Sequence, residues 1–323
     1  MPGGSGASAP LCSPTSVQGK AWMPSSAGSA GRSCLKRSKR PGPKHRHALS
    51  LTFAHRYGRT VLEEIRFSGV MKVIRPLEVG DRVLVQLITL GPGLMDGDLA
   101  EIWVRVGPGS KAIVLAQSAG KVCPGLVRQR VHLEVEEGGE LEYYPGLTIL
   151  FPGGGLFQEV EASLASTARL GLMEVWALGR TGRGEAHDFF GLETRTLVDQ
   201  KGLPLYRDAL RLTPLDASLP GVLEGRPYLA AGFWTWEGLP PGRGRALAWS
   251  LTHRGHTVVR GLGRAEEDLP GEAAGFLLWA RAQWGLPPVD LQRFSSAWVQ
   301  PVQGLSRGET PGALQGVVSA EEF

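Results

Sequence analysis

The sequence predicts a mainly β protein with layered sheets, in a β-helix-like or sandwich arrangement, and a few helices, one of them near the C-terminus. Short segments of alternating apolar and polar residues recur at intervals of about ten residues, with Gly- and Pro-rich turns between them, as in layered β folds. Glycine also makes up 45 of the 323 residues, about twice the usual share. This abundance of turn formers favours sheets over a helical bundle.

The expected strands follow from this alternation with a period of two residues. In residues 101–106, for example, Ile102, Val104 and Val106 fall on one face of an extended chain. The expected strands cover residues 61–67, 82–88, 101–106, 112–116, 128–135, 140–144, 147–151, 157–165, 170–179, 186–198, 205–212, 227–236, 245–252 and 257–261.

One convincing helix is expected near the C-terminus, over residues 272–284. Apolar residues recur there at spacings of three and four, which places them on one helical face. These residues are Ala273, Phe276, Leu277, Ala280 and Trp284. The pair Pro287-Pro288 lies just beyond and ends the pattern.

The basic character of the chain resides in its N-terminal segment. The sequence has 35 Lys and Arg against 31 Asp and Glu, a formal net charge of +4. Eight of the basic residues and no acidic residue lie in residues 1–50, so residues 51–323 carry a net charge of −4. This mildly acidic body argues against nucleic acid as its partner.

The composition divides the chain into three parts. Residues 1–50 are rich in Ser, Gly, Ala and Pro, and we expect them to form a disordered basic tail because they cannot bury enough apolar surface. A transit peptide, a nucleic-acid-binding arm and a translated upstream sequence without function remain open for this tail. We expect a β domain over residues 51–300 and a flexible tail over residues 301–323.

The cysteines and the hydropathy pattern indicate the compartment. Of Cys12, Cys34 and Cys123, a single one lies in the expected β domain, so that domain has no disulfide framework. The chain has no apolar run of about 18 residues and no secretory signal pattern. We therefore expect a cytoplasmic protein with no membrane partner.

The most distinctive polar cluster is Glu185-Ala186-His187-Asp188. If this segment starts a strand, Glu185 and His187 point to the same face. A carboxylate and an imidazole together suit a divalent ion such as Ni²⁺ or Zn²⁺. The plain alternative is an exposed strand start beside a glycine-rich turn.

The order of several motifs resembles the urease accessory protein D family (UreD, called UreH in some bacteria). Gly91–Asp98 corresponds to the family's Pro-Gly-Gly…Gly-Gly-Asp turn, and Gln117–Lys121 to its Pro-Gly-Ala-Thr-Lys segment. Gly139–Pro145 is similar to Gly-Ala-x-Leu-Glu-Trp-Leu-Pro, and Leu178–Glu185 looks like Leu-Gly-Arg-x-x-x-Gly-Glu. Further matches follow the family order: Thr148-Ile149, Phe151-Pro152-Gly153, Gly191, Arg195, Gly202-Leu203-Pro204 and Leu210-Arg211-Leu212.

The resemblance spans about residues 52–298, with departures that mark a divergent member. Asp96 stands where the family's turn usually has Gly, and residues 122–124 replace its aromatic and basic residues. Leu147 replaces the acid of the family's Pro-Gln-Glu-Thr-Ile, and His187 has no clear counterpart.

The resemblance implies a non-catalytic scaffold of mainly β architecture. Such proteins bind accessory proteins F and G, dock on apo-urease and help deliver Ni²⁺ to the urease active site through an internal channel. It implies no catalytic residue and no tightly bound cofactor, only transient contact with Ni²⁺. The sequence leaves two alternatives open: a metal-dependent hydrolase that uses Glu185, His187 and Asp188, and a protein that binds nucleic acid through its basic tail.

The same motif matching assigns residues to the metal path or to partner binding. In this interpretation Glu185 lines the path, Asp98 braces its turn and Lys121 anchors a loop. His187 has no clear family counterpart and is added as a candidate because of its spacing to Glu185. The residues expected to shape these motifs are Gly91, Gly93, Gly97, Gly179, Arg180 and Gly184.

Overall fold

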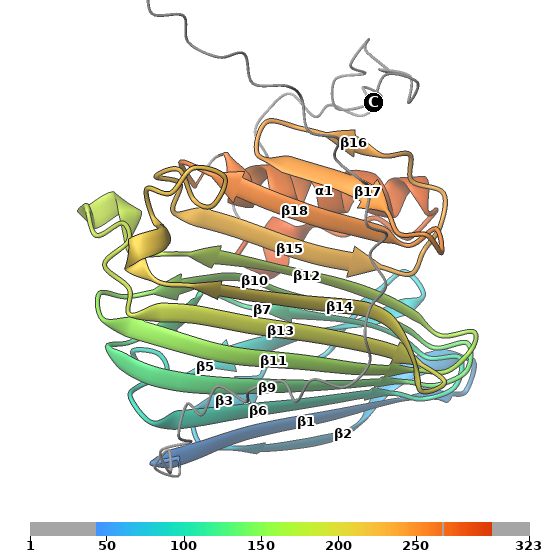
Figure 1. Cartoon of the computed structure of the whole chain (residues 1–323). Helices are drawn as coiled ribbons and strands as arrows, with labels where there is room; N and C mark the ends of the chain where they lie inside the picture. The colour runs from blue at the N-terminus through green and yellow to red at the C-terminus, as the bar shows by residue number, and fades with distance from the viewer. Residues whose placement is uncertain (1–42, 267, 299–323) are drawn as a thin grey trace, which may run out of the picture. The chain divides into compact units, whose positions relative to one another are not determined.

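The strands form two sheets that face each other as layers (Figure 1). The computed structural model describes residues 43–266 and 268–298. Within these residues, sheet A has seven strands and sheet B has eleven. The expected layered, mainly β fold is therefore confirmed.

The spatial order of the strands differs from their order along the chain. Across sheet A the order is β14 (Leu203–Leu212), β13 (Gly191–Gln200), β11 (Gly154–Leu164), β9 (Gly125–Val135), β6 (Asp98–Val106), β1 (His45–Arg56) and β2 (Arg59–Ser68). Across sheet B it is β16 (Gly242–Arg243), β17 (Leu247–Leu251), β18 (Thr257–Gly263), β15 (Tyr228–Trp234), β12 (Arg169–Ala177), β10 (Glu140–Leu150), β7 (Lys111–Ala116), β5 (Arg82–Thr89) and β3 (Met71–Val73), while β4 (Leu77–Val79) pairs with β5 and β8 (Gly120–Val122) with β10.

The chain winds between the sheets as in a β-helix. From β5 to β13 it passes alternately through sheet B and sheet A, except that the short strand β8 follows β7 within sheet B, and the strands that become neighbours within a sheet run parallel. Parallel strands cannot be joined by a tight hairpin, and here each crossover is a strand of the other sheet. In sheet A this winding aligns Val104, Leu133 and Ala162 in one row of buried side chains.

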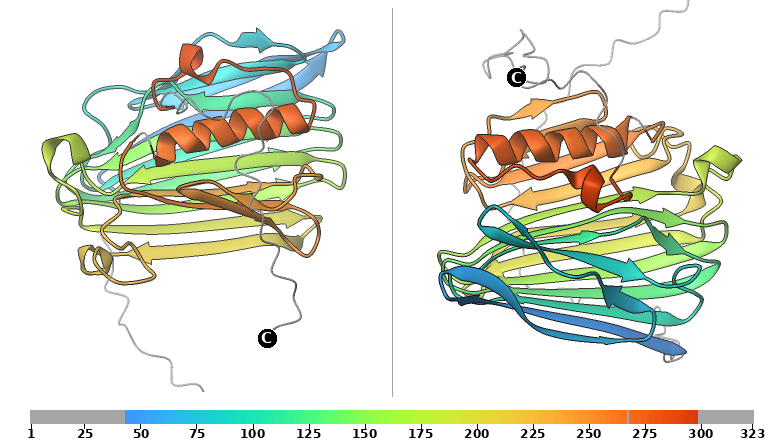
Figure 2. Two further views of the ribbon diagram at one scale, coloured as in Figure 1. Left: turned by 90° about the horizontal axis from the view of Figure 1, so that it is seen from above. Right: turned by 180° about the vertical axis from the view of Figure 1, so that it is seen from behind.

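Apolar side chains fill the space between the sheets and the space between sheet B and helix α1 (Leu269–Gln283). Helix α1 lies on the face of sheet B that is turned away from sheet A (Figure 2). Its buried face includes Ala273, Phe276, Leu277 and Ala280, as the spacing predicted. Of the helices in the described ranges, none is long and apolar enough to cross a membrane.

The segment after α1 is hydrogen-bonded to strands β7 and β10 of sheet B. Helix α2 (Leu291–Phe294) is followed by Ser295, whose hydroxyl donates to the carbonyl of Ala116, and by Ala297, whose carbonyl accepts from Leu147 N at 3.2 Å. This last bond lies where the register of β10 shifts. Residues 140–144 and 147–151, expected as two strands, therefore belong largely to one irregular strand, β10.

Two further boundaries differ from expectation. Strand β13 begins at Gly191, so the expected strand start at residue 186 is wrong, because residues 186–190 belong to the connection that precedes it. Strand β1 begins at His45, inside the range assigned to the basic tail. Residues 1–42 of that tail and the whole expected tail 301–323 lie outside the described residues.

Candidate functional site

Four connections lead from sheet B to sheet A in the described chain, and all lie at the same end of the sandwich. They cover residues 90–97, 117–124, 151–153 and 178–190, and the second of them includes the short strand β8. We call this end the motif end, because each connection contains one of the segments that resemble the accessory family. The last of them carries the short helix η1 (Thr181–Arg183) and projects at the left of Figure 1.

Asp98 closes the first connection. Its carboxylate accepts a hydrogen bond from Met95 N at 2.8 Å, and its own N–H donates to the Met95 carbonyl at 3.0 Å. His47 Nε2 lies 3.1 Å from the same carboxylate, which is 4% exposed. These contacts tie the Asp98 side chain to the turn that precedes β6.

Lys121 joins the first connection to the second through its backbone. Its carbonyl accepts a hydrogen bond from Leu94 N at 2.9 Å, and its side chain is exposed. Gly93 passes so close that a Cβ there would lie 2.5 Å from the Lys121 carbonyl oxygen. At φ 132° Gly93 also has a backbone conformation that favours glycine. The other glycines expected to shape these motifs likewise have positive φ: Gly91, Gly97, Gly179 and Gly184.

Arg180 and Glu185 form a closed pair in the fourth connection. Arg180 Nη2 donates to Glu185 Oε1 at 2.6 Å, and Arg180 Nε donates to the other carboxylate oxygen. The hydrogen bond to Glu185 raises the pKa of Arg180. The guanidinium also lies 4.5 Å from the ring centroid of Phe151, in the third connection. Both Glu185 oxygens are thus engaged in holding the loop.

His187 does not pair with Glu185. Residues 185–187 follow η1 in a loop, so the expectation that a strand aligns these two side chains is wrong. His187 has φ 69°, and its backbone N–H donates to the Leu178 carbonyl at 2.6 Å. Its two ring nitrogens are buried and have no hydrogen-bond partner among the described residues. Among the described residues, His187 therefore forms no dyad with Glu185 or Asp188, the grouping that the hydrolase alternative requires.

The motif end thus brings the predicted residues to one end of the fold in separate groups. Asp98 and Lys121 secure the first two connections, while Glu185 and His187 belong to the fourth. Across residues 43–266 and 268–298, no group of three or more His, Cys, Asp or Glu is placed to hold a metal ion.

A polar layer between the sheets was missed by the sequence reasoning. On the inner face of sheet A, Gln129, Gln158 and Thr194 lie opposite one another in neighbouring strands. From sheet B, the buried Glu174 carboxylate accepts a hydrogen bond from Gln158 Nε2. We call Gln129, Gln158, Glu174 and Thr194 the polar belt. It separates two apolar clusters, one around Val131 and Val160 and one around Val127 and Leu156.

Burial dominates the electrostatics of the polar belt. It raises the pKa of Glu174 from 4.5 to about 7, and the Asp208 carboxylate adds to this while the Gln158 hydrogen bond opposes it. Burial likewise raises the pKa of Tyr143, whose hydroxyl has no hydrogen-bond partner in the part of the chain that is described. At the sheet edge, Arg260 of sheet B pairs with Asp208 of sheet A. The belt therefore holds a carboxylate that is partly protonated near neutral pH.

The sequence does contain a signal for this layer. Gln158 and Glu174 occupy inward positions of strands whose other inward residues are apolar, such as Val160 and Leu172. A polar residue in an apolar register needs a buried partner, because an unpaired polar group costs free energy.

Comparisons with known proteins agree with this architecture. The family model described as UreD urease accessory protein matches residues 45–291. "Urease accessory protein UreD 1" of Synechococcus sp. (strain JA-3-3Ab) is 45% identical over 260 residues, which cover 77% of this chain and 96% of that protein. "Urease accessory protein UreD" of Sorangium cellulosum (strain So ce56) is 31% identical over 254 residues, covering 74% and 81%.

A further relative carries the alternative family name. "Urease accessory protein UreH" of Helicobacter hepaticus (strain ATCC 51449 / 3B1) is 26% identical over 168 residues, covering 51% of this chain and 67% of that protein. Fold and matches together define a urease accessory protein. The chain belongs to the UreD family.

Proposed function

We propose that this protein is a non-catalytic cytoplasmic scaffold for urease maturation. It docks on apo-urease together with accessory proteins F and G and helps to deliver Ni²⁺ to the urease active site. Membership of the UreD family supports the maturation role. The polar belt is the structural observation that supports a role in handling the metal.

The proposed metal path runs between the two sheets along the polar belt. Glu174 offers a carboxylate and Gln158 an amide at a depth where most other inward side chains are apolar. With a pKa of about 7, Glu174 can exchange its proton for a cation near neutral pH. Oxygen donors hold Ni²⁺ less tightly than imidazole or thiolate, which suits passage of the ion rather than storage.

We propose that the metal path reaches the motif end of the scaffold and that the partner proteins bind there. Asp98 and Lys121 fix the first two connections, and the Arg180–Glu185 pair fixes the fourth. The ring nitrogens of His187 have no hydrogen-bond partner among the described residues, and imidazole is a suitable ligand for nickel. We therefore assign His187 to transient metal contact and Glu185 to positioning of its loop.

The test is nickel loading of urease in cells. A strain that carries the urease genes but lacks this protein is complemented with the wild type, with Glu174→Gln or with the matched control Glu161→Gln, which changes an exposed carboxylate on the outer face of sheet A. Nickel per purified urease and urease activity are then measured.

We expect full loading with the wild type and Glu161→Gln, and reduced loading with Glu174→Gln at equal recovery of the accessory complex. Fully nickel-loaded urease in the strain without the protein would contradict the maturation role. Full loading with Glu174→Gln would leave that role intact and remove the polar belt from the path.

A further inference from the structure

The outer face of sheet A carries no helix of the described chain. Helix α1 covers sheet B on the opposite side, as the views in Figures 1 and 2 show. A sheet face without a covering layer is either exposed to water or covered by a partner. Polar side chains indicate the first case, and a patch of exposed apolar side chains indicates the second.

In the middle of this face, positive and negative side chains of the protein neutralise one another. One row across it alternates in charge from strand to strand: Glu101, Arg130, Glu159 and Arg195. Arg130 Nε lies 3.6 Å from Glu159 Oε2, and Arg195 Nη1 lies 3.9 Å from Glu159 Oε1. These charges satisfy one another, so this row needs no partner.

The face differs where the strands of sheet A begin, at the motif end. There Leu126, Gly155 and Gly191 lie opposite one another, and the Phe190 ring lies over Gly155, where a Cβ would approach it to 2.9 Å. Phe190 is 67% exposed and Leu126 37%. Met95 is 52% exposed and precedes Asp96, whose carboxylate accepts from Leu126 N at 2.9 Å. Phe190 and Leu126 are therefore exposed apolar side chains on either side of Gly155, and the exposed Met95 lies in the connection bound to Leu126.

The next row of the same face carries charge that is not compensated. It consists of Arg128, Phe157, Glu193 and Arg211. Glu193 is engaged by Arg195 at 2.7 Å. Arg128 and Arg211 form no ion pair with any described residue, and neither does the exposed Lys121. Asp188, close to Phe190 in sequence, likewise forms no ion pair with a described residue, so the three unpaired cations leave this end of the face with excess positive charge.

We propose that Met95, Leu126 and Phe190, with Arg128 and Arg211 beside them, form a docking surface for a protein partner that is apolar at its centre and acidic around it. Phenylalanine, methionine and arginine are enriched at protein–protein interfaces, and guanidinium groups bind carboxylates through paired hydrogen bonds. The positive charge of this surface favours an acidic partner over a second copy of the chain, because a second copy would bring Arg128 and Arg211 to face like charges. This surface rests on the proposed function, in that the partner belongs to the urease maturation assembly.

The experiment measures binding of the purified full chain to purified accessory proteins F and G and to apo-urease from the same organism, at low and high salt. The test variants are Phe190→Ser and the double variant Arg128→Glu/Arg211→Glu. The controls are Trp103→Ser, an exposed aromatic elsewhere on this face, and Arg207→Glu, on the same strand as Arg211. Thermal unfolding checks that each variant is folded.

For one of the three partners, we expect each test variant to raise the Kd by about tenfold or more, and the controls to leave it unchanged. The wild-type affinity should fall with salt, and the charge-reversed variant should lose this dependence. Test variants that bind like the wild type overturn the surface but not the proposed function. A wild type that binds none of the three partners overturns both. A wild-type homodimer that Phe190→Ser dissociates overturns the acidic partner in favour of a second copy.

Discussion

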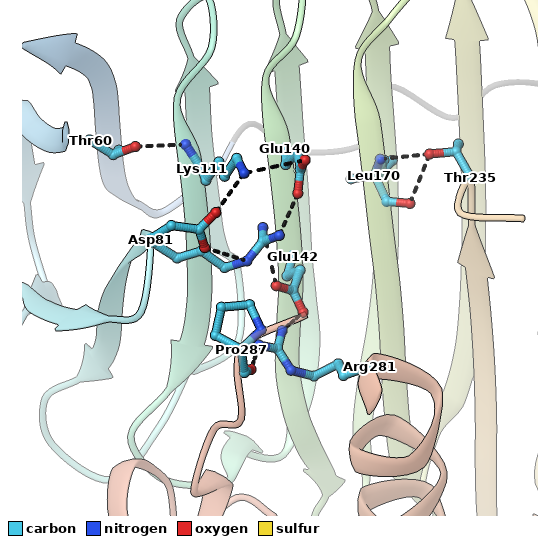
Figure 3. Close-up of polar contacts among 10 residues, drawn as sticks. Thr60, Asp81, Lys111, Glu140, Glu142, Leu170, Thr235, Arg281 and Pro287 are labelled. Carbon is cyan, nitrogen blue, oxygen red and sulfur yellow. Dashed lines mark hydrogen bonds and ion pairs between the residues drawn. The ribbon is translucent and has the colours of Figure 1, made fainter. Parts of the chain in front are cut away.

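Arg281 of helix α1 forms a buried ion pair with Glu142 in the centre of sheet B, across 139 residues of sequence (Figure 3). The two side chains are 2% and 0% exposed. Arg82 Nη1 lies 3.5 Å from the other Glu142 oxygen, and Arg281 Nη2 donates to the Pro287 carbonyl at 2.5 Å. The Glu142 carboxylate thus links the central strand β10, the start of β5 and helix α1.

Breaking this pair should destabilise the whole fold. Arg281→Met leaves Glu142 charged and buried with Arg82 as its remaining cationic neighbour, and removal of one partner from a buried pair typically costs about 3–5 kcal/mol. Denaturant unfolding should show a correspondingly lower free energy of unfolding. Arg56→Ala, which breaks the exposed pair with Glu63, should leave the midpoint unchanged. An equal shift in both variants would contradict a special role of the buried pair.

Glu174 should make stability depend on pH near neutrality. Its folded-state pKa of about 7 lies above its ordinary value of 4.5, so between these values the folded protein binds more protons than the unfolded chain. Stability should therefore fall as the pH rises from about 5 to about 8, by up to about 3 kcal/mol from this group. Glu174→Gln should remove this part of the dependence, as measured by denaturant unfolding at both pH values. A slope identical to that of the wild type would show that Glu174 ionises normally.

Gly179→Ala should disrupt the fourth connection. Gly179 has φ 124°, and a Cβ at this position would collide with the Glu185 carbonyl oxygen. The substitution should cost more than about 1 kcal/mol and accelerate proteolysis of residues 178–190. Gly182→Ala is the matched control, because a Cβ there has open space and the backbone is ordinary. If both variants are cleaved at the wild-type rate, the close approach of Gly179 to Glu185 is not maintained in solution.

Asp98→Ala should loosen the first connection. It removes the acceptor for Met95 N, and the exposed amide should exchange with solvent faster. The expected loss of stability is about 1–3 kcal/mol. Asp98→Asn retains an acceptor oxygen and should exchange close to the wild-type rate, whereas Asp188→Ala, at an exposed position, should change neither quantity. If the Met95 amide of Asp98→Ala exchanges as slowly as in the wild type, backbone hydrogen bonds alone hold the turn.

The sequence predicts strands well where one face of a strand alternates cleanly. Residues 101–106 fall within β6, and Ile102, Val104 and Val106 are buried as expected. β10 was harder, because Pro145 and Gly146 resemble a turn, yet the strand continues after a shift in register. Its continuation is supported by Ala297, some 150 residues further along the chain, which no local pattern reveals.

The site shows the same division. The glycines and Asp98 of the motif end lie in local turns, a feature that their spacing along the sequence can indicate. The polar belt depends on Gln158 and Glu174 meeting across two sheets, and this requires knowledge of the winding. His187 was misplaced because local alternation was extended through residues that belong to a loop.

The winding of the chain between the sheets has a practical consequence for dividing the protein. A cut in the connection 151–153 leaves strands of both layers in each fragment, because the chain visits the sheets in turn. The fragments would expose matching edges, β9 against β11 and β10 against β12, each with unpaired backbone groups ready to pair. This architecture therefore lends itself to a split-protein reporter, in which reassembly of two fused halves signals that their carriers have met.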